Sequence, residues 1–345
     1  MKNHNLFIYL KIVMMMLCAI VGMGFISGAE IYQFFARFEI FSIFSIIIFF
    51  ILMYLLSYKI IWKNRDIQND VKMNNLNKNP SKNTFLNKVK IKSFLTNLNL
   101  LLVSSAMFAG LFSLTKNLFI HNCYLVGFFV CVIVFLILYF GVSILQKFDI
   151  IVICFVGFIF FHFLFDLIFN FSEIDFNQQS FGCLNMVKNC FGSVVFACLY
   201  VFMNIVQIQP IAHEFDGKLN SKHKWLAPLI FSISITILLS VFVCFMLEIY
   251  SLKNCEMPFF DYFKTQGGVM YFVYILGLIL ALLSSLLSCL IGVKRCVGKR
   301  IKSNFFTTGS SILLSMTISL IGFSNFVSIV YPIIGLINFI IFIFL

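Results

Sequence analysis

The stretch Gly22-Met-Gly-Phe-Ile-Ser-Gly-Ala-Glu30 interrupts the first long apolar segment of the chain. That segment covers roughly residues 6–38, and as one continuous α-helix its 33 or so residues would measure about 50 Å. A bilayer core needs only about 20 apolar residues. Three glycines and a carboxylate near the middle of an overlong span therefore predict two half-helices joined by open backbone. Open backbone survives at membrane depth only where protein covers it or where it lines a polar cavity.

The composition is that of a polytopic membrane protein. Of the 345 residues, 61% are hydrophobic and 11% are charged, and the mean hydropathy is +1.02. A soluble domain is nearer half apolar and a quarter charged. We therefore expect an all-α protein in which residues 1–345 form a single transmembrane domain.

The hydropathy pattern predicts ten membrane spans. They lie near residues 8–37, 40–62, 94–115, 122–146, 149–171, 187–212, 225–250, 267–293, 304–322 and 325–345. With this count and both termini in the cytoplasm, most of the 25 Lys and Arg residues fall on the cytoplasmic side, as the positive-inside rule requires. The net charge of +12 then reports topology in the plasma (inner) membrane, with some attraction to anionic lipid, and does not indicate a nucleic-acid partner.

The spans divide into two groups of five, about 8–171 and 187–345. Residues 63–93, which lie within the first group, are rich in Asn and Lys without hydrophobic periodicity and predict a flexible cytoplasmic loop. An odd number of spans in each half makes the second half enter the membrane from the opposite side, as in an inverted repeat. This arrangement predicts that span 6 mirrors the interrupted span 1.

Span 6 carries polar residues that suit such a second interruption. Tyr200, Asn204 and Gln207 lie in an apolar run that ends near Pro210. Proline removes a helical hydrogen bond, and side-chain amides offer donors and acceptors at depth. We therefore expect helices 1 and 6 both to be broken, with a substrate site between them.

Residues in spans 1 and 10 resemble the YkvI-like membrane protein family. The matching residues are Gly22-x-Gly24-Phe25-x-Ser27-Gly28-x-Glu30 with Phe34-Phe35, and Gly322-Phe323 with Tyr331-Pro332-x-x-Gly335. The resemblance extends over essentially all ten spans. It implies a relation to the amino acid–polyamine–organocation transporters and their LeuT-type fold of five plus five inverted spans. Ala29 departs from the pattern, because a polar residue, often Gln, is expected before the Glu.

The first break offers candidate binding groups. Gly22, Gly24 and Gly28 let the backbone open, so that free carbonyls can coordinate a cation and free N–H groups can bind a substrate carboxylate. Ser27 adds a hydroxyl at the same place. The alternative is that these small residues serve close helix packing.

Glu30 is the single most informative residue of the break. A carboxylate at the centre of a membrane span costs about 2.5–3.5 kcal/mol on insertion scales, so it requires a partner or a function. It could recognise a substrate amine, carry a proton, or pair structurally with Arg37 two turns later.

Two other groups are candidates for ion coupling. By the resemblance, Ser284 and Ser285 in span 8 would hold Na⁺ together with span 1 carbonyls, since hard cations favour oxygen ligands. The alternative is that these hydroxyls bond their own helix. His162 and Asp166 stand four residues apart in span 5 and suit a proton relay, or equally a hydrated mouth near the outer end.

We find no metalloprotease, nucleophile-elbow, P-loop or dinucleotide-binding motif, so we expect no enzyme and no ATP-driven pump. The leading hypothesis is a secondary carrier for a small amine- or carboxylate-bearing solute, with Na⁺ or H⁺ as the coupling ion and no other cofactor. The alternative is a non-transporting membrane sensor or scaffold. The two differ at the break, where a carrier needs a hydrated polar cavity and a scaffold packs dry.

Overall fold

In the residues that it describes, the computed structural model consists of helices joined by short turns and has no strands. These are residues 2–74, 82–118, 129–130, 132–136, 138, 143–169, 183–214, 225–297 and 304–344. Most of the expected span at 122–146 therefore lies outside the described residues. Within them, seven helices are long and apolar enough to cross a membrane, and two shorter apolar helices cover Tyr9–Ile20 and Phe305–Ile321. The length and apolar composition of these helices thus support a polytopic membrane protein.

The elements follow one another along the chain as helices of very different lengths. They are α1 (Lys2–Ile20), α2 (Met23–Ile26), α3 (Ala29–Phe34), η1 (Ala36–Phe41), α4 (Ser42–Asn74), α5 (Lys82–Leu118), α7 (Ser143–Phe169), α8 (Cys183–Glu214), α9 (Leu226–Glu248), η3 (Tyr250–Leu252), α10 (Pro258–Gln266), α11 (Gly268–Val297), α12 (Asn304–Ile318), η4 (Ser319–Ile321), α13 (Phe323–Asn325), η5 (Phe326–Val330) and α14 (Tyr331–Phe344).

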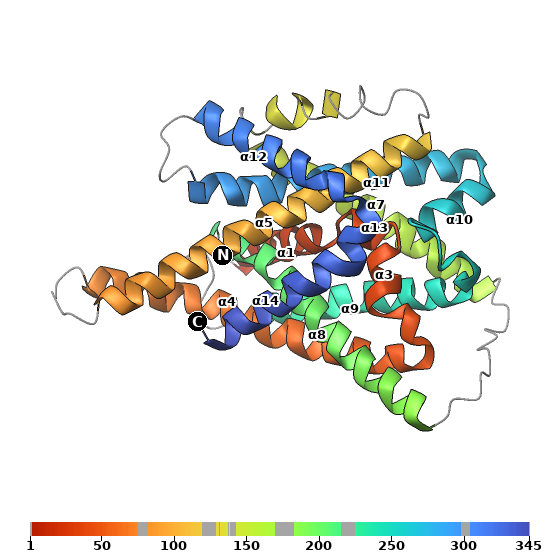
Figure 1. Cartoon of the computed structure of the whole chain (residues 1–345), viewed down its shortest axis with the longest axis horizontal. Helices are drawn as coiled ribbons and strands as arrows, with labels where there is room; N and C mark the ends of the chain where they lie inside the picture. The colour runs from red at the N-terminus through yellow and green to blue at the C-terminus, as the bar shows by residue number, and fades with distance from the viewer. Residues whose placement is uncertain are drawn as a thin grey trace.

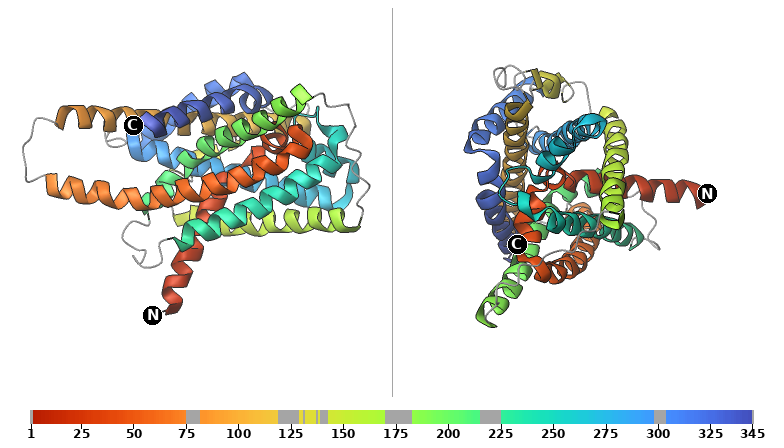
Figure 2. Two further views of the ribbon diagram at one scale, coloured as in Figure 1. Left: turned by 90° about the horizontal axis from the view of Figure 1, so that it is seen from below. Right: turned by 90° about the vertical axis from the view of Figure 1, so that its right-hand side faces the viewer.

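Long helices run side by side along the length of the molecule and form its bundle (Figure 1). α8 packs against α4 and α14, and α5 packs against α11 and α12. α1 enters this bundle from the side: its N-terminal part projects away from the other helices in both views of Figure 2. α1 contacts α7, α8, α9 and α11, and most of its side chains from Ile12 to Ile20 are buried, so this part of α1 lies in the core.

The first span is broken, as the glycine cluster predicts. α1 ends at Ile20, and the backbone is interrupted at Val21–Gly22 before the short helix α2. A second interruption, at Ser27–Gly28, separates α2 from the short helix α3. Gly28 has φ +82°, a left-handed conformation that side chains disfavour. The ring of Phe259 lies 3.0 Å from the position that a Cβ at Gly28 would take, so a larger residue there would also crowd this ring.

The predicted break in span 6 is wrong, because α8 continues without interruption from Cys183 to Glu214. The polar residues bond inside the helix instead of opening it. The Asn204 amide nitrogen donates to the Tyr200 carbonyl oxygen at 3.0 Å, and the Gln207 amide nitrogen donates to Asn204 Oδ1 at 3.1 Å. Amides that are satisfied within one helix need no open backbone at membrane depth.

The segment 63–93 also differs from the flexible loop expected there. α4 continues to Asn74 and α5 begins at Lys82, and both helices extend beyond the bundle in Figure 1. Adding a residue to an existing helix costs far less than starting one, so long apolar helices extend readily into polar sequence. Residues 75–81 lie outside the described residues.

Candidate functional site

The Glu30 carboxylate lies against the backbone of α2, which the turn at Ser27–Gly28 makes possible. Glu30 belongs to the first turn of α3 and is 3% exposed. Its side chain reaches back over Gly24 so closely that a Cβ at Gly24 would overlap the carboxylate. Gly24 therefore makes room for a buried acid, which is a different role from opening the backbone.

Tyr200 from α8 holds this carboxylate in place. Its hydroxyl donates a hydrogen bond to Glu30 Oε2 at 2.9 Å, and the Tyr200 ring is fully buried. Phe34 and Phe35 pack on that ring, with centroids 5.0 Å and 5.2 Å away. Of the three candidates in span 6, Tyr200 thus contacts the broken first span, whereas Asn204 and Gln207 bond within α8.

Tyr331, the first residue of α14, completes the cluster. It is fully buried and lies within electrostatic range of both Glu30 and Tyr200. Its hydroxyl has no hydrogen-bond partner in the structure. A buried unpaired hydroxyl costs about 1–3 kcal/mol, so this group suits a guest that supplies the missing bond. In the sequence, Tyr331 stands out only as part of the motif that resembles the YkvI-like family. A tyrosine in an apolar segment does not by itself indicate a binding residue.

Arg37 does not neutralise Glu30. Its guanidinium carbon lies 3.9 Å from the centroid of the Phe196 ring and 4.7 Å from that of Phe38. This places the cation in a cation–π contact near the end of the break. Structural pairing with Arg37, one of the three roles considered for Glu30, is therefore not observed. The other two roles, recognition of a substrate amine and carriage of a proton, stay open. We call Gly24, Glu30, Tyr200 and Tyr331 the acid cluster.

Protein donors occupy three backbone carbonyls at the second interruption. Ser27 Oγ donates to the Gly24 carbonyl at 3.2 Å, the Tyr274 hydroxyl donates to that of Ile26 at 2.9 Å, and the Phe259 N–H donates to that of Ser27 at 3.0 Å. The carbonyls of Ile26 and Ser27 therefore fix the break against α11 and α10, and that of Gly24 is bonded within the break. Coordination of a cation by them would require these bonds to open.

The two serines of span 8 behave differently from each other. Ser285 Oγ bonds the Ala281 and Leu282 carbonyls of its own helix at 3.0 Å and 3.1 Å, as the packing alternative expects. It also lies 3.3 Å from the position of a Cβ at Gly22. Ser284 Oγ instead donates to Asp149 Oδ1 at 2.6 Å. Ser285 Oγ also contacts Met107 Sδ of α5 at 3.2 Å, so both serines reach beyond their own helix, and Ser284 is the one of the two that bonds a carboxylate there.

Asp149 is the main residue that the sequence reasoning missed. It is 4% exposed, and its carbonyl oxygen accepts from the thiol of Cys18, in the last turn of α1, at 3.2 Å. A carboxylate and a hydroxyl next to the end of α1 form an oxygen-rich position of the kind that hard cations prefer. The available signal was an acid at the start of an apolar span. Among the described residues, no group of three or more His, Cys, Asp or Glu side chains could hold a metal ion.

His162 and Asp166 lie together at the other end of α7. His162 Nδ1 is 3.7 Å from Asp166 Oδ2, and their side chains are 18% and 14% exposed. The Tyr262 hydroxyl of α10 donates to Asp166. Burial and the neighbouring Asp166 carboxylate raise the pKa of Tyr262 above its ordinary range. The partial exposure of His162 and Asp166 and the bond from α10 favour the second alternative, a hydrated position near the outer end of span 5, over a buried proton relay.

Comparison of the chain with family models, with characterised proteins and with solved structures finds no match.

Proposed function

We propose that the chain is a secondary carrier that moves a small amine-bearing solute across the plasma (inner) membrane by alternating access. The observation that carries this proposal is the acid cluster. A carboxylate is buried on a broken membrane helix with one hydroxyl donor, Tyr200, and with a second hydroxyl, Tyr331, left unpartnered. Ten spans in a LeuT-type arrangement related to the YkvI-like family belong to the same proposal.

The charge of the site favours the amine end of the solute. A buried carboxylate without a cation is expensive, so the cluster favours either a proton or a cationic guest. An ammonium group can neutralise the Glu30 carboxylate by pairing with it. Because it carries three N–H donors, it can at the same time donate a hydrogen bond to a tyrosine oxygen such as that of Tyr331. A solute carboxylate at the same point would meet a like charge.

Asp149 with Ser284 is the position that we assign to the coupling ion. Ser284 Oγ and Asp149 Oδ1 are 2.6 Å apart beside the inner end of α1, and both residues are buried. Na⁺ or H⁺ bound here would bias the position of α1, because the Cys18 thiol of α1 donates to the Asp149 carbonyl oxygen. Protonation of Glu30 is the other route to coupling and would make solute and proton compete for one carboxylate.

A sensor or scaffold is the second candidate, and one observation favours it. The carbonyls of Ile26 and Ser27 already have protein donors, and aromatic rings surround Tyr200. A dry, fixed break of this kind suits a protein that does not open. A carrier in a closed state has the same contacts, so transport itself must be measured.

The test is uptake of pooled labelled amines and amino acids into proteoliposomes under imposed Na⁺ or pH gradients. We expect gradient-driven accumulation by the wild type and at least a tenfold loss in Glu30→Gln. Asp149→Asn and Ser284→Ala should abolish the dependence on the gradient, whereas His162→Gln should retain it. Absence of uptake for every compound and gradient, with well-folded protein, would favour the scaffold.

A further inference from the structure

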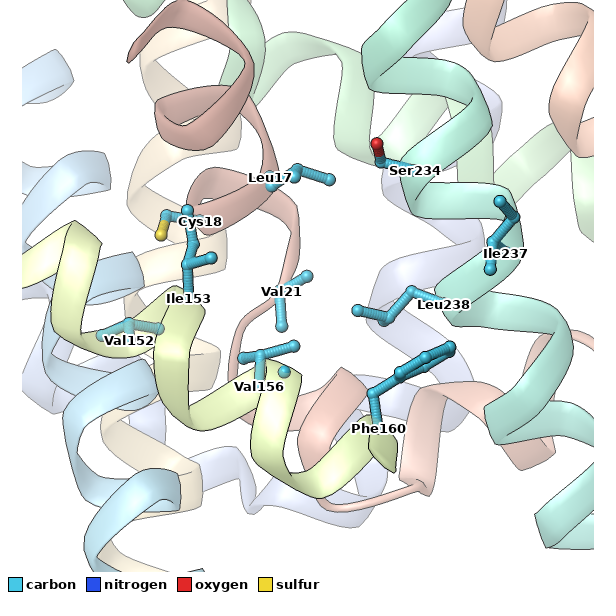
Figure 3. Close-up of a pocket in the computed structure, with 11 residues that line it drawn as sticks. Leu17, Cys18, Val21, Val152, Ile153, Val156, Phe160, Ser234, Ile237 and Leu238 are labelled. Carbon is cyan, nitrogen blue, oxygen red and sulfur yellow. The ribbon is translucent and has the colours of Figure 1, made fainter. Parts of the chain in front are cut away.

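A cavity of about 290 Å³ lies between α1, α7 and α9, on a part of the break that the acid cluster does not use. Figure 3 shows its side chains converging from three helices and from the interruption after α1, among them Leu17, Val21, Val156, Phe160 and Leu238. The lining is apolar apart from the thiol of Cys18 and the hydroxyl of Ser234. Such a surface offers almost nothing to a polar solute.

Exposed apolar side chains lie at and beside the lining of the cavity. Ile237 lines it and is also 52% exposed, and Ile151 and Phe161 on α7 are exposed on either side of the lining residues of that helix. In a membrane span, an exposed apolar side chain faces lipid. A molecule that enters here therefore comes from the hydrocarbon phase.

Residues at the start of the same helices suit a lipid headgroup. Lys11 stands seven residues before Cys18 on α1, a rise of about 10 Å along the helix. Trp225 directly precedes α9 and is 46% exposed. In the expected topology α1, α7 and α9 all begin at the cytoplasmic face. Lysine near the membrane surface attracts anionic lipid, and tryptophan is enriched at that depth.

We propose that this cavity binds one acyl chain of a membrane phospholipid, whose anionic headgroup lies near Lys11 and Trp225. The end of the chain would contact Val21, the first residue after α1, where the helix is interrupted. Because α1 forms one wall, occupancy of the cavity and the tilt of α1 depend on each other. This site is separate from the acid cluster and does not require that the protein be a carrier.

Gly157 provides a clean way to fill the cavity. It lines the cavity, and a Cβ at this position would meet nothing within 4 Å. The Cβ of a larger residue therefore has open space here, and we choose Gly157→Leu as the filling variant. Gly309→Leu on α12 is the matched control, since its Cβ would also meet nothing within 4 Å and it does not line the cavity. Val156→Phe is a second filling variant in case Gly157→Leu does not fold.

The experiment reconstitutes the full chain with an anionic phospholipid that carries a diazirine on its acyl chain, and maps the photoadducts by mass spectrometry. Cys18 and Val21 are each 2% exposed, so lipid that merely surrounds the protein does not reach them. We expect adducts at these residues in the wild type and in Gly309→Leu, with at least a tenfold loss in a folded filling variant. Adducts at exposed Phe272 should be equal in all. Labelling confined to exposed positions, or unchanged labelling of Val21 in the filled variants, would overturn the proposal.

Discussion

Gly24→Ala is expected to destabilise the protein by driving the Glu30 carboxylate out of its place. The new methyl group would occupy space that the carboxylate now fills, and Glu30 is buried, so the overlap can be relieved only by moving Glu30 or α2. Either movement strains or breaks the hydrogen bond from Tyr200, which is the one that holds the acid.

The expected cost follows from two contributions. Overpacking a filled interior costs about 1–3 kcal/mol. Loss of a hydrogen bond to a charged group costs about 1.5–3 kcal/mol, or about half that if the acid is protonated. The free energy of unfolding should therefore fall by about 2–6 kcal/mol, a large change for a single methyl group. In Glu30→Ala the space over Gly24 is vacated, so the same methyl group should cost less than about 1 kcal/mol there.

A double-mutant cycle measures this coupling directly. We would unfold Gly24→Ala, Glu30→Ala and the double variant in detergent by heat or denaturant, with Gly309→Ala as the control for adding a methyl group in open space. The coupling energy is the difference between these two costs, so at least about 1 kcal/mol is expected. Equal costs of Gly24→Ala in both backgrounds would refute the placement of the carboxylate over Gly24.

Three further predictions concern the surroundings of the break. Gly28→Ala should lower stability by about 1–3 kcal/mol, because it combines φ +82° with a ring at 3.0 Å; thermal unfolding checks this, and a neutral result would contradict the left-handed turn. Tyr331→Phe removes a hydroxyl without a partner, so it should leave stability unchanged or higher while raising the KM for uptake; a loss of stability would mean that the hydroxyl is bonded. The pKa of Tyr262 is raised, so the stability from its protonated hydroxyl is complete below about pH 10, the ordinary value for tyrosine, and is lost as the pH rises beyond it. Unfolding from pH 8 to 11 should therefore show a steeper alkaline loss in the wild type than in Tyr262→Phe, and parallel curves would argue against the bond to Asp166.

The break in span 1 was predictable because its cause is local. Three glycines in an apolar segment too long for the bilayer weaken one helix wherever it lies in the fold. The same reasoning failed in span 6, because Asn204 and Gln207 find their partners within one turn of the same helix. Residue type alone does not distinguish an amide that lines a site from one that bonds its own helix.

The partners of the candidate residues depended on contacts between distant segments. Ser284 and Ser285 are adjacent and chemically identical, yet only Ser284 meets Asp149, 135 residues away. Tyr331 lies within electrostatic range of Glu30 because α14 packs on α8, which carries Tyr200. Such contacts are fixed by helix packing, and a single sequence contains no pattern that reports them.

Counterflow in proteoliposomes is the most direct test of the carrier itself, since it needs no knowledge of the coupling ion. Vesicles loaded with an unlabelled amine identified in the uptake screen are diluted into a trace of the same amine with label. Transient accumulation of label is expected for the wild type, and none is expected for Glu30→Gln. Equal label in wild-type, Glu30→Gln and protein-free vesicles would contradict alternating access at the acid cluster.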